Sequence, residues 1–216
     1  MPQIDVVESG PKPGLRERNK RDKLERIVQA AGDLFREQGF EQTTGRQICE
    51  RAGIGTGTLF LYVKDKRELL SLIFEPLANE VFARLPRGLG SKESLVDGLA
   101  RLFGALFRLY ARDHTISKLF VQDLLFSGYD SPGMQTLHDE LRDRVVELVR
   151  DAQARKALRS DISAEQLSTA FLAHYVFWLQ LWLGSGGVSQ RVANQGLRSA
   201  LRLQFEGVRM TRKGRR

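Results

Sequence analysis

A short segment near the N-terminus constrains the fold more than any other part of the chain. Residues 44–67 read TGRQICERAGIGTGTLFLYVKDKR. The hydroxyl of Thr44 can cap a first short helix, and Gly53 can end it because glycine readily adopts the positive φ of a C-terminal cap. Leu59 and Val63, four residues apart, then give a second short helix one buried side. Two short helices bent about a glycine predict a helix-turn-helix, whose second helix can enter the DNA major groove.

The same segment resembles the DNA-binding domain of the TetR family of bacterial transcriptional regulators. The residues that carry the resemblance are Thr43, Thr44, Ile48, Ala52, Gly53, Ile54, Gly57, Thr58, Leu59, Tyr62 and Lys66. The resemblance is close over residues 20–70 and extends to the rest of the chain only in length and helical character. It implies an all-α fold, with an N-terminal three-helix helix-turn-helix DNA-binding domain and a larger C-terminal helical domain for ligand binding and dimerisation.

Three positions depart from the usual pattern of the family. Gly55 stands where a serine often caps the second helix, Phe60 where a tyrosine is common, and Val63 where an aromatic residue is common. The first change removes a hydroxyl that can contact a phosphate, and the second removes a phenol. We therefore expect no phosphate contact from a hydroxyl at these two positions.

Other residues at matching motif positions are expected to contact DNA. Hydroxyl and ammonium groups beside the helix ends suit phosphate oxygens, and they belong to Thr44, Thr58, Tyr62 and Lys66. The residues expected to approach base edges are Arg46, Thr56, Gly57 and Leu61. An arginine can bond the O6 and N7 atoms of guanine, and a leucine can touch the methyl group of thymine.

Changes in composition divide the chain into four segments. We predict a disordered arm over residues 1–19, which are rich in proline, glycine and charge. The DNA-binding domain follows over 20–67, with its motif at 44–63. An effector-binding and dimerisation domain spans 68–210, and a basic tail spans 211–216.

The charge of the chain favours a polyanionic partner without proving one. The net charge is +8 and the pI is near 9.9. Six basic and three acidic residues lie within 16–26, where we favour a solvated segment over phosphate contacts. The single cysteine, Cys49, excludes an internal disulfide and any metal site built from several cysteines. Burial as a small apolar residue is its favoured role.

The sequence lacks the motifs of common enzymes and of membrane proteins. Its three histidines lie far apart, and the glycines of 53–57 lack the Lys-Ser/Thr of a phosphate-binding loop. We therefore expect no enzymatic activity, no cofactor and no metal. No apolar stretch reaches the roughly 18 residues of a membrane-spanning helix, and the N-terminus lacks the apolar core of a signal peptide. A soluble, cytoplasmic protein without a membrane partner is predicted.

Aromatic residues are dense in the larger domain. We name as candidates for an apolar effector pocket Phe103, Phe107, Tyr110, Phe120, Phe126, His138, Tyr175 and Trp178. For each of them, filling the core of a helical domain is the more frequent role. The resemblance to the TetR family implies an effector cavity somewhere in this domain but does not say which side chains line it.

The last two helices, predicted over 164–183 and 188–208, carry more apolar surface than one chain can cover. We expect them to form a four-helix bundle with a second copy. The expected interface residues are Leu172, Val176, Leu179, Leu183, Leu197, Leu201 and Phe205. A two-fold axis through this bundle predicts a palindromic operator.

Two functions are compatible with these features. The first is a dimeric repressor that a small apolar effector releases from its operator. The alternative is a constitutive DNA-binding or architectural dimer without an effector. The repressor requires a cavity in the larger domain, whereas the alternative predicts a filled core.

Overall fold

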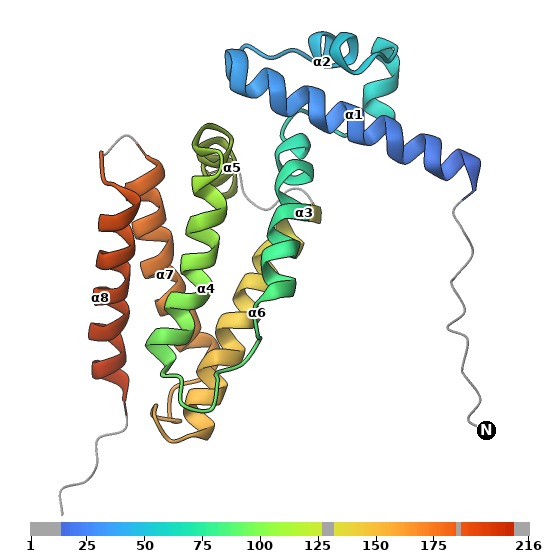
Figure 1. Cartoon of the computed structure of the whole chain (residues 1–216). Helices are drawn as coiled ribbons and strands as arrows, with labels where there is room; N and C mark the ends of the chain where they lie inside the picture. Colours follow the sequence, from blue (N-terminus) through green and yellow to red (C-terminus); the bar gives the residue numbers. More distant parts are fainter. Residues whose placement is uncertain (1–13, 127–131, 185–186, 210–216) are drawn as a thin grey trace, which may run out of the picture. The chain divides into compact units, whose positions relative to one another are not determined.

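The computed structural model describes residues 14–126, 132–184 and 187–209, which form nine helical elements and no β-strand. The chain divides into two compact units, Met1–Lys66 and Arg67–Arg216. Figure 1 shows the helices of both units. Within the described residues, no helix combines the length and the hydropathy that crossing a membrane requires.

The smaller unit contains three helices. These are the long helix α1 (Leu15–Gln38), the short helix α2 (Gly45–Ala52) and the 3-10 helix η1 (Thr56–Leu61). Helix α2 packs against both α1 and η1. Their apolar faces form one small core, whose buried members include Ile27, Ala31, Leu34, Phe35, Ile48, Cys49 and Leu59. The predicted all-α helix-turn-helix architecture is confirmed.

Two boundaries in this unit differ from the sequence prediction. Helix α1 begins at Leu15, so residues 15–19, which we predicted to be disordered, are helical. Leucine, arginine and glutamate fill four of these five positions, and all three are good helix formers. The second helix of the motif, expected over 56–63, is a 3-10 helix that ends at Leu61. Gly57 between two threonines explains this, because all three residues are poor α-helix formers. Residues 1–13 lie outside the described residues.

The larger unit contains six helices. They are α3 (Glu68–Arg84), α4 (Leu95–Ala111), α5 (His114–Phe126), α6 (Pro132–Ala154), α7 (Ala164–Leu183) and α8 (Gln190–Val208). Helix α4 is central, because it contacts α3, α5, α6 and α8. Helix α7 has the predicted bounds and starts at a capping box made by Ser163 and Gln166.

The loop between α3 and α4 is held by three arginines, which we call the arginine clamp: Arg101, Arg144 and Arg155. Arg101 donates hydrogen bonds to the carbonyls of Pro86 and Gly88, both at 3.2 Å. Arg144 reaches the carbonyl of Leu85 at 3.1 Å, and Arg155 reaches those of Leu89 and Gly90 at 2.6 and 2.8 Å. These bonds satisfy carbonyl groups of residues 85–90, directly after α3, and attach this loop to α4, to α6 and to Arg155 just beyond α6.

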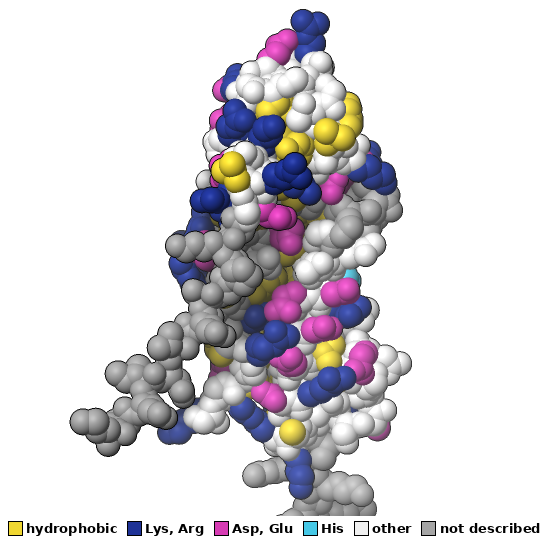
Figure 2. Space-filling view, turned by 90° about the vertical axis from the view of Figure 1, so that its right-hand side faces the viewer, with side chains coloured by type: hydrophobic (Ala, Val, Ile, Leu, Met, Phe, Trp, Pro, Cys, Tyr) yellow, Lys and Arg dark blue, Asp and Glu magenta, His cyan; other side chains and the backbone are white. Residues whose placement is uncertain are grey.

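Ion pairs continue this network over the surface of α6. Arg144 is buried, pairs with Glu140 at 2.7 Å and lies over the ring of Phe82. Arg87 bridges Glu140 and Glu147 at 3.2 and 2.9 Å. Figure 2 shows acidic and basic side chains interspersed over one face of this unit. The arginine clamp and these ion pairs therefore attach the segment directly after α3 to α4 and α6.

Candidate DNA interface and effector cavity

A capping box fixes the N-terminus of α2. Thr44 Oγ1 accepts a hydrogen bond from the backbone N–H of Gln47 at 3.3 Å. The side chain of Gln47 in turn accepts one from the backbone N–H of Thr44 at 2.8 Å. Thr44 is exposed and Gln47 partly exposed, so the capping box leaves a hydroxyl and an amide group at the surface of the first turn of α2. Such groups are the usual partners of DNA phosphates.

Two glycines allow α2 and η1 to lie close together. Gly53 ends α2 with φ 63° and ψ 43°, which is the left-handed conformation that glycine adopts without strain. At Gly45 a β-carbon would lie 3.3 Å from Leu59, so a larger residue there would push η1 away. The turn and the close approach together set the angle between the two helices.

Helix η1 exposes two large apolar side chains. Phe60 is 69% exposed and Leu61 is 78% exposed. Leu59, on the inner side of the same helix, is buried. Thr56 and Gly57 are also exposed. Apolar side chains in this position have no partner in the unit and suit the apolar edges of bases. Phe60 was not among the predicted contacts. The sequence feature that could have identified it is a large apolar residue next to Leu61 on the outer side of the motif.

Arg46 lies on the exposed side of α2. Its guanidinium pairs with Glu50 at 2.9 Å, and the two side chains are 80% and 60% exposed. Solvent screens an exposed ion pair of this kind, so Arg46 can leave Glu50 for a base or a phosphate at little cost.

Lys66 has partners inside the smaller unit. Its ammonium donates hydrogen bonds to the carbonyl oxygens of Phe40, Thr43 and Glu41, the last two at 3.0 and 3.5 Å. It also lies 4.2 Å from the centre of the Phe40 ring. An ammonium group has three donors, so a phosphate contact at Lys66 would compete with these bonds. The ammonium group thus stabilises the loop between α1 and α2.

We expect Lys66→Ala to lower the free energy of unfolding of the smaller unit by about 1–3 kcal/mol, because it leaves carbonyl groups without their partner. Chemical denaturation followed by circular dichroism would measure this. Lys20→Ala provides the control, since Lys20 is exposed on α1 and its substitution removes the same charge. Equal stability of the two variants would contradict a structural role for Lys66.

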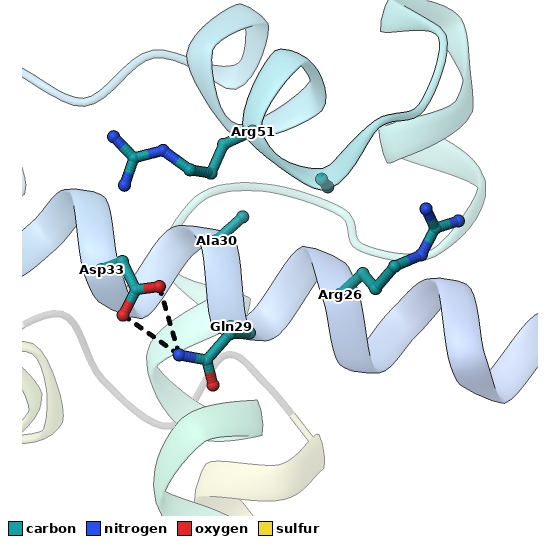
Figure 3. Close-up of a pocket in the computed structure, with 6 residues that line it drawn as sticks. Arg26, Gln29, Ala30, Asp33 and Arg51 are labelled. Atoms are coloured by element: carbon teal, nitrogen blue, oxygen red, sulfur yellow. Dashed lines mark hydrogen bonds between the residues drawn. The ribbon is translucent and has the colours of Figure 1, made fainter.

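An open cleft of about 200 Å³ lies between α1 and α2 (Figure 3). Arg26, Gln29 and Asp33 line it from α1, and Arg51 lines it from α2. Two of its charged groups have partners: Asp33 accepts a hydrogen bond from Gln29 at 3.1 Å, and Arg51 forms two 2.8 Å hydrogen bonds with Glu37. None of the predicted DNA contacts lines this cleft, which acts as a polar seam between the two helices.

A second cavity, of about 50 Å³, lies inside the larger unit between α3, α4, α5 and α6. Its lining residues are Phe74, Ala78, Phe82, Leu106, Leu109, Tyr110, Phe120, Leu124, Leu137, His138 and Leu141. All of them are apolar or aromatic except His138. Burial lowers the pKa of His138, so its imidazole is neutral at pH 7.

The predicted effector residues divide into two groups. Tyr110, Phe120 and His138 line the cavity. Phe103, Phe107 and Tyr175 instead form a buried aromatic column beside it, in which Phe103 stacks on Tyr175 with ring centres 4.6 Å apart.

The remaining two predicted residues do not line the cavity in the described structure. Trp178 packs on α8, where a β-carbon at Gly196 would lie 2.2 Å from its ring. The side chain of Phe126 lies outside the described residues.

The prediction missed Phe74, Ala78 and Phe82. Their spacing of four residues on α3 was the available signal, because it places all three on one face of a helix.

Comparison with known proteins gives one consistent answer. The family of bacterial regulatory proteins named tetR matches residues 27–73. The fatty acid metabolism regulator protein of Bacillus subtilis (strain 168) is 26% identical over 133 residues, which cover 62% of this chain and 63% of that protein. The transcriptional repressor KstR2 of Mycolicibacterium smegmatis is 26% identical over 172 residues, covering 78% of this chain and 82% of that protein. The chain belongs to the TetR family.

The fold agrees with this assignment. The crystal structure of Thermus thermophilus FadR, a TetR family transcriptional repressor in complex with lauroyl-CoA, matches with a TM-score of 0.69 and 26% identity. The match covers 88% of this chain and 97% of that chain. The protein is therefore a DNA-binding transcriptional regulator of the TetR family and not an enzyme.

All eight predicted DNA contacts of this TetR-family chain lie in the smaller unit, and none of them is buried. Thr44, Arg46, Thr56, Gly57 and Leu61 are exposed, and Thr58, Tyr62 and Lys66 are partly exposed. They come from α2, from η1 and from the segment that follows η1.

The predicted dimer residues require a correction. Leu179, Leu183, Leu197 and Leu201 are at most 2% exposed within a single chain, so they are core residues and cannot contact a second copy. The reason is that α7 and α8 pack against each other and on the central helices, which buries these stripes. Leu172, Val176 and Phe205 keep part of their surface exposed.

Proposed function

We propose that this regulator is a repressor that a medium- or long-chain fatty acyl-CoA releases from its operator. The observation that carries the proposal is the apolar cavity that three residues of α3 line. Helix α3 follows directly on the DNA-binding unit, so a ligand in this cavity contacts the element that joins the two units. The similarity to FadR of Thermus thermophilus, described in complex with lauroyl-CoA, supports an acyl-CoA as the ligand.

The cavity must widen to accept an acyl chain. Its volume of about 50 Å³ is well below the roughly 300–1,000 Å³ of ligand pockets. Phe74 of α3 stacks on Phe120 of α5 with ring centres 4.1 Å apart, and Tyr110 lies within 6.4 Å of both rings. An acyl chain that separates this ring pair would displace α3 from α5. Such a ligand prefers the displaced state, which is what coupling to DNA binding requires.

His138 favours a thioester over a free fatty acid. Because burial lowers its pKa, the imidazole in the cavity wall is neutral at pH 7. A neutral imidazole can bond a thioester carbonyl, whereas a carboxylate would enter an apolar cavity without a counter-charge. We therefore expect the acyl-CoA, and not the fatty acid, to be the effector.

The test uses a DNA site selected by the protein itself from a random-sequence pool. Fluorescence anisotropy would report the affinity for this site with lauroyl-CoA, with free coenzyme A and with lauric acid. We expect only lauroyl-CoA to weaken binding, by a coupling of about 1–3 kcal/mol. DNA binding that no acyl-CoA weakens would favour the constitutive alternative.

We also propose a homodimer that forms through the outer faces of α7 and α8. Phe177 on α7 is 54% exposed, and Val192 and Leu203 on α8 are 49% and 76% exposed. Val192, Ser199 and Leu203 follow at intervals of seven and four residues, so they lie on one face of α8, which Glu206 borders near the end of the helix. These exposed apolar side chains on both helices are the reason for placing the second copy against α7 and α8.

Two copies related by a two-fold axis would present two η1 helices to one duplex. We therefore propose a palindromic operator whose half-sites are about one helical turn apart, or a multiple of it. We also propose that this regulator acts in the bacterial cytoplasm.

The predicted DNA contacts belong to this proposal, and Arg46 tests them. Arg46→Ala should cost about 1–3 kcal/mol of operator binding and relax the preference at one base pair. Arg51→Ala is the matched control, because Arg51 lies on the same helix but pairs with Glu37 in the polar seam. Binding measurements on single-base variants of the operator would show the difference. Equal losses for both variants would remove Arg46 from the base contacts.

A further inference from the structure

The N-terminal part of α1 extends beyond the core of the DNA-binding unit. Figure 1 shows it projecting past α2 and η1. Residues 15–23 are exposed, and the first buried residue of the helix is Ile27. At about 1.5 Å per residue, residues 15–26 span about 18 Å. We call these residues the helical arm.

Basic and acidic residues are separated on the helical arm. Arg16, Lys20, Lys23 and Ile27 follow at intervals of four, three and four residues, so they lie on one face of the helix. Ile27 is fully buried and belongs to the face of α1 that packs on α2. The three basic residues, which we call the basic stripe, therefore continue this face beyond the core.

The acidic residues of the arm lie on other faces. Glu17, Asp22 and Glu25 are each offset from the basic stripe along the helix. On the opposite side, Arg21 forms an ion pair with Glu25 at 3.8 Å. The basic stripe is thus free of carboxylates on the side of the helix-turn-helix, which is where the DNA would lie.

The start of the arm has the charge pattern that a helix alone disfavours. Its N-cap, Gly14, provides no side-chain hydrogen bond, and the first turn holds two cations, Arg16 and Arg18, against one anion, Glu17. Cations at a helix N-terminus are opposed by the helix dipole, whereas anions there are favoured. An anionic partner along the arm would remove this conflict and stabilise its first turns.

We propose that the helical arm binds the DNA phosphodiester backbone that flanks the groove occupied by η1. Arg16, Lys20 and Lys23 contact phosphates, and they do so without reading sequence. Three turns of helix are long enough to reach across a major groove about 12 Å wide. The proposal extends the interface beyond the helix-turn-helix and rests on the DNA-binding function of the protein.

An anionic membrane surface is a less suitable partner for the arm. Membrane-surface helices combine basic residues with bulky apolar residues on the opposite face. Of the residues in the arm, only Leu15 and Leu24 are large and apolar, and Leu24 is partly covered by the unit. A helix with basic residues on one face and no apolar face opposite is better suited to contact nucleic acid.

Two double variants of the full-length protein test the proposal. Lys20→Ala with Lys23→Ala removes two charges from the basic stripe, and Arg18→Ala with Arg21→Ala removes two charges from the other faces of the same arm. Alanine is a strong helix former, so both variants keep the helix. The probe is a labelled duplex of arbitrary sequence and about three helical turns, titrated between about 50 and 200 mM salt.

We expect the stripe variant to lower the slope of log affinity against log salt by about two units, since each phosphate contact contributes about 0.9. The control variant should change the slope by less than half of that amount. Equal slopes for the two variants, or an unchanged slope in the stripe variant, would overturn the proposal. If the wild-type protein did not bind the duplex, the DNA-binding function itself would be contradicted. A wild-type protein that binds, together with a stripe variant of unchanged slope, would contradict only the role of the helical arm.

Discussion

Leu203→Asp should convert the regulator into a folded monomer that binds its operator about 100-fold more weakly or worse. Leu203 is 76% exposed on α8, so a carboxylate there costs the single chain little. In a dimer the same position would face a second copy, and the carboxylate would be buried without a partner. A monomer engages one half-site only and loses the gain of joining two binding events, which is commonly 100-fold or more. Sedimentation and operator binding would measure both effects.

Leu201→Asp provides the contrast, two residues away on the same helix. Leu201 is fully buried within the chain, so a charge there should unfold the larger unit instead of producing a stable monomer. Far-ultraviolet circular dichroism would separate the two outcomes. A Leu203→Asp protein that stays dimeric would move the interface away from α8. A stably folded Leu201→Asp monomer would contradict the assignment of this residue to the core.

Ala78→Leu should abolish the response to acyl-CoA while the protein still binds DNA. Ala78 lines the cavity from α3 and is 7% exposed. The larger side chain would occupy much of the small volume into which an acyl chain must first insert. We expect a loss of about tenfold or more in acyl-CoA affinity, at a stability cost of about 1–3 kcal/mol for the extra volume. Isothermal titration with lauroyl-CoA would measure the affinity.

Ala83→Leu is the matched control for this substitution. Ala83 lies on the same helix but is exposed and does not line the cavity, so lauroyl-CoA should still release the DNA. If Ala78→Leu also retained a wild-type response, the effector would have to bind elsewhere in the larger unit.

The helix-turn-helix could be predicted from sequence because its signals are local. The capping box of Thr44 and the left-handed cap at Gly53 depend on residues within three or four positions of each other. The starting point of α1 was missed for the opposite reason. Composition rich in charge indicates both disorder and solvated helix, and only the continuity with the buried face at Ile27 distinguishes them.

The surfaces of the larger unit were harder to predict, because periodicity identifies an apolar face but not its neighbour. Leu197 and Leu201 were expected at a subunit interface, yet α7 and α4 of the same chain cover them. The cavity shows the same limit. Tyr110 and Phe120 line it, but Phe107 stacks on Trp182 in the adjacent column. Which aromatic residues border a space depends on how the helices are placed, and no local pattern encodes this.

Because the arginine clamp holds the chain at the C-terminal end of α3, a movement of this helix would pivot about that end, which serves as its fulcrum. The clamp holds the chain at Leu85 and beyond, whereas the cavity contacts α3 around Ala78. Pro76 lies inside α3 between the two points; for a helix that moves as one rigid body, Ala78 is about 10 Å from the fulcrum and Glu68 about 25 Å. A ligand that shifts Ala78 by about 1 Å would then move Glu68, next to the DNA-binding unit, by about 2.5 Å. A regulator built this way can respond to a small change of packing in its interior with a larger displacement where its chain enters the DNA-binding unit.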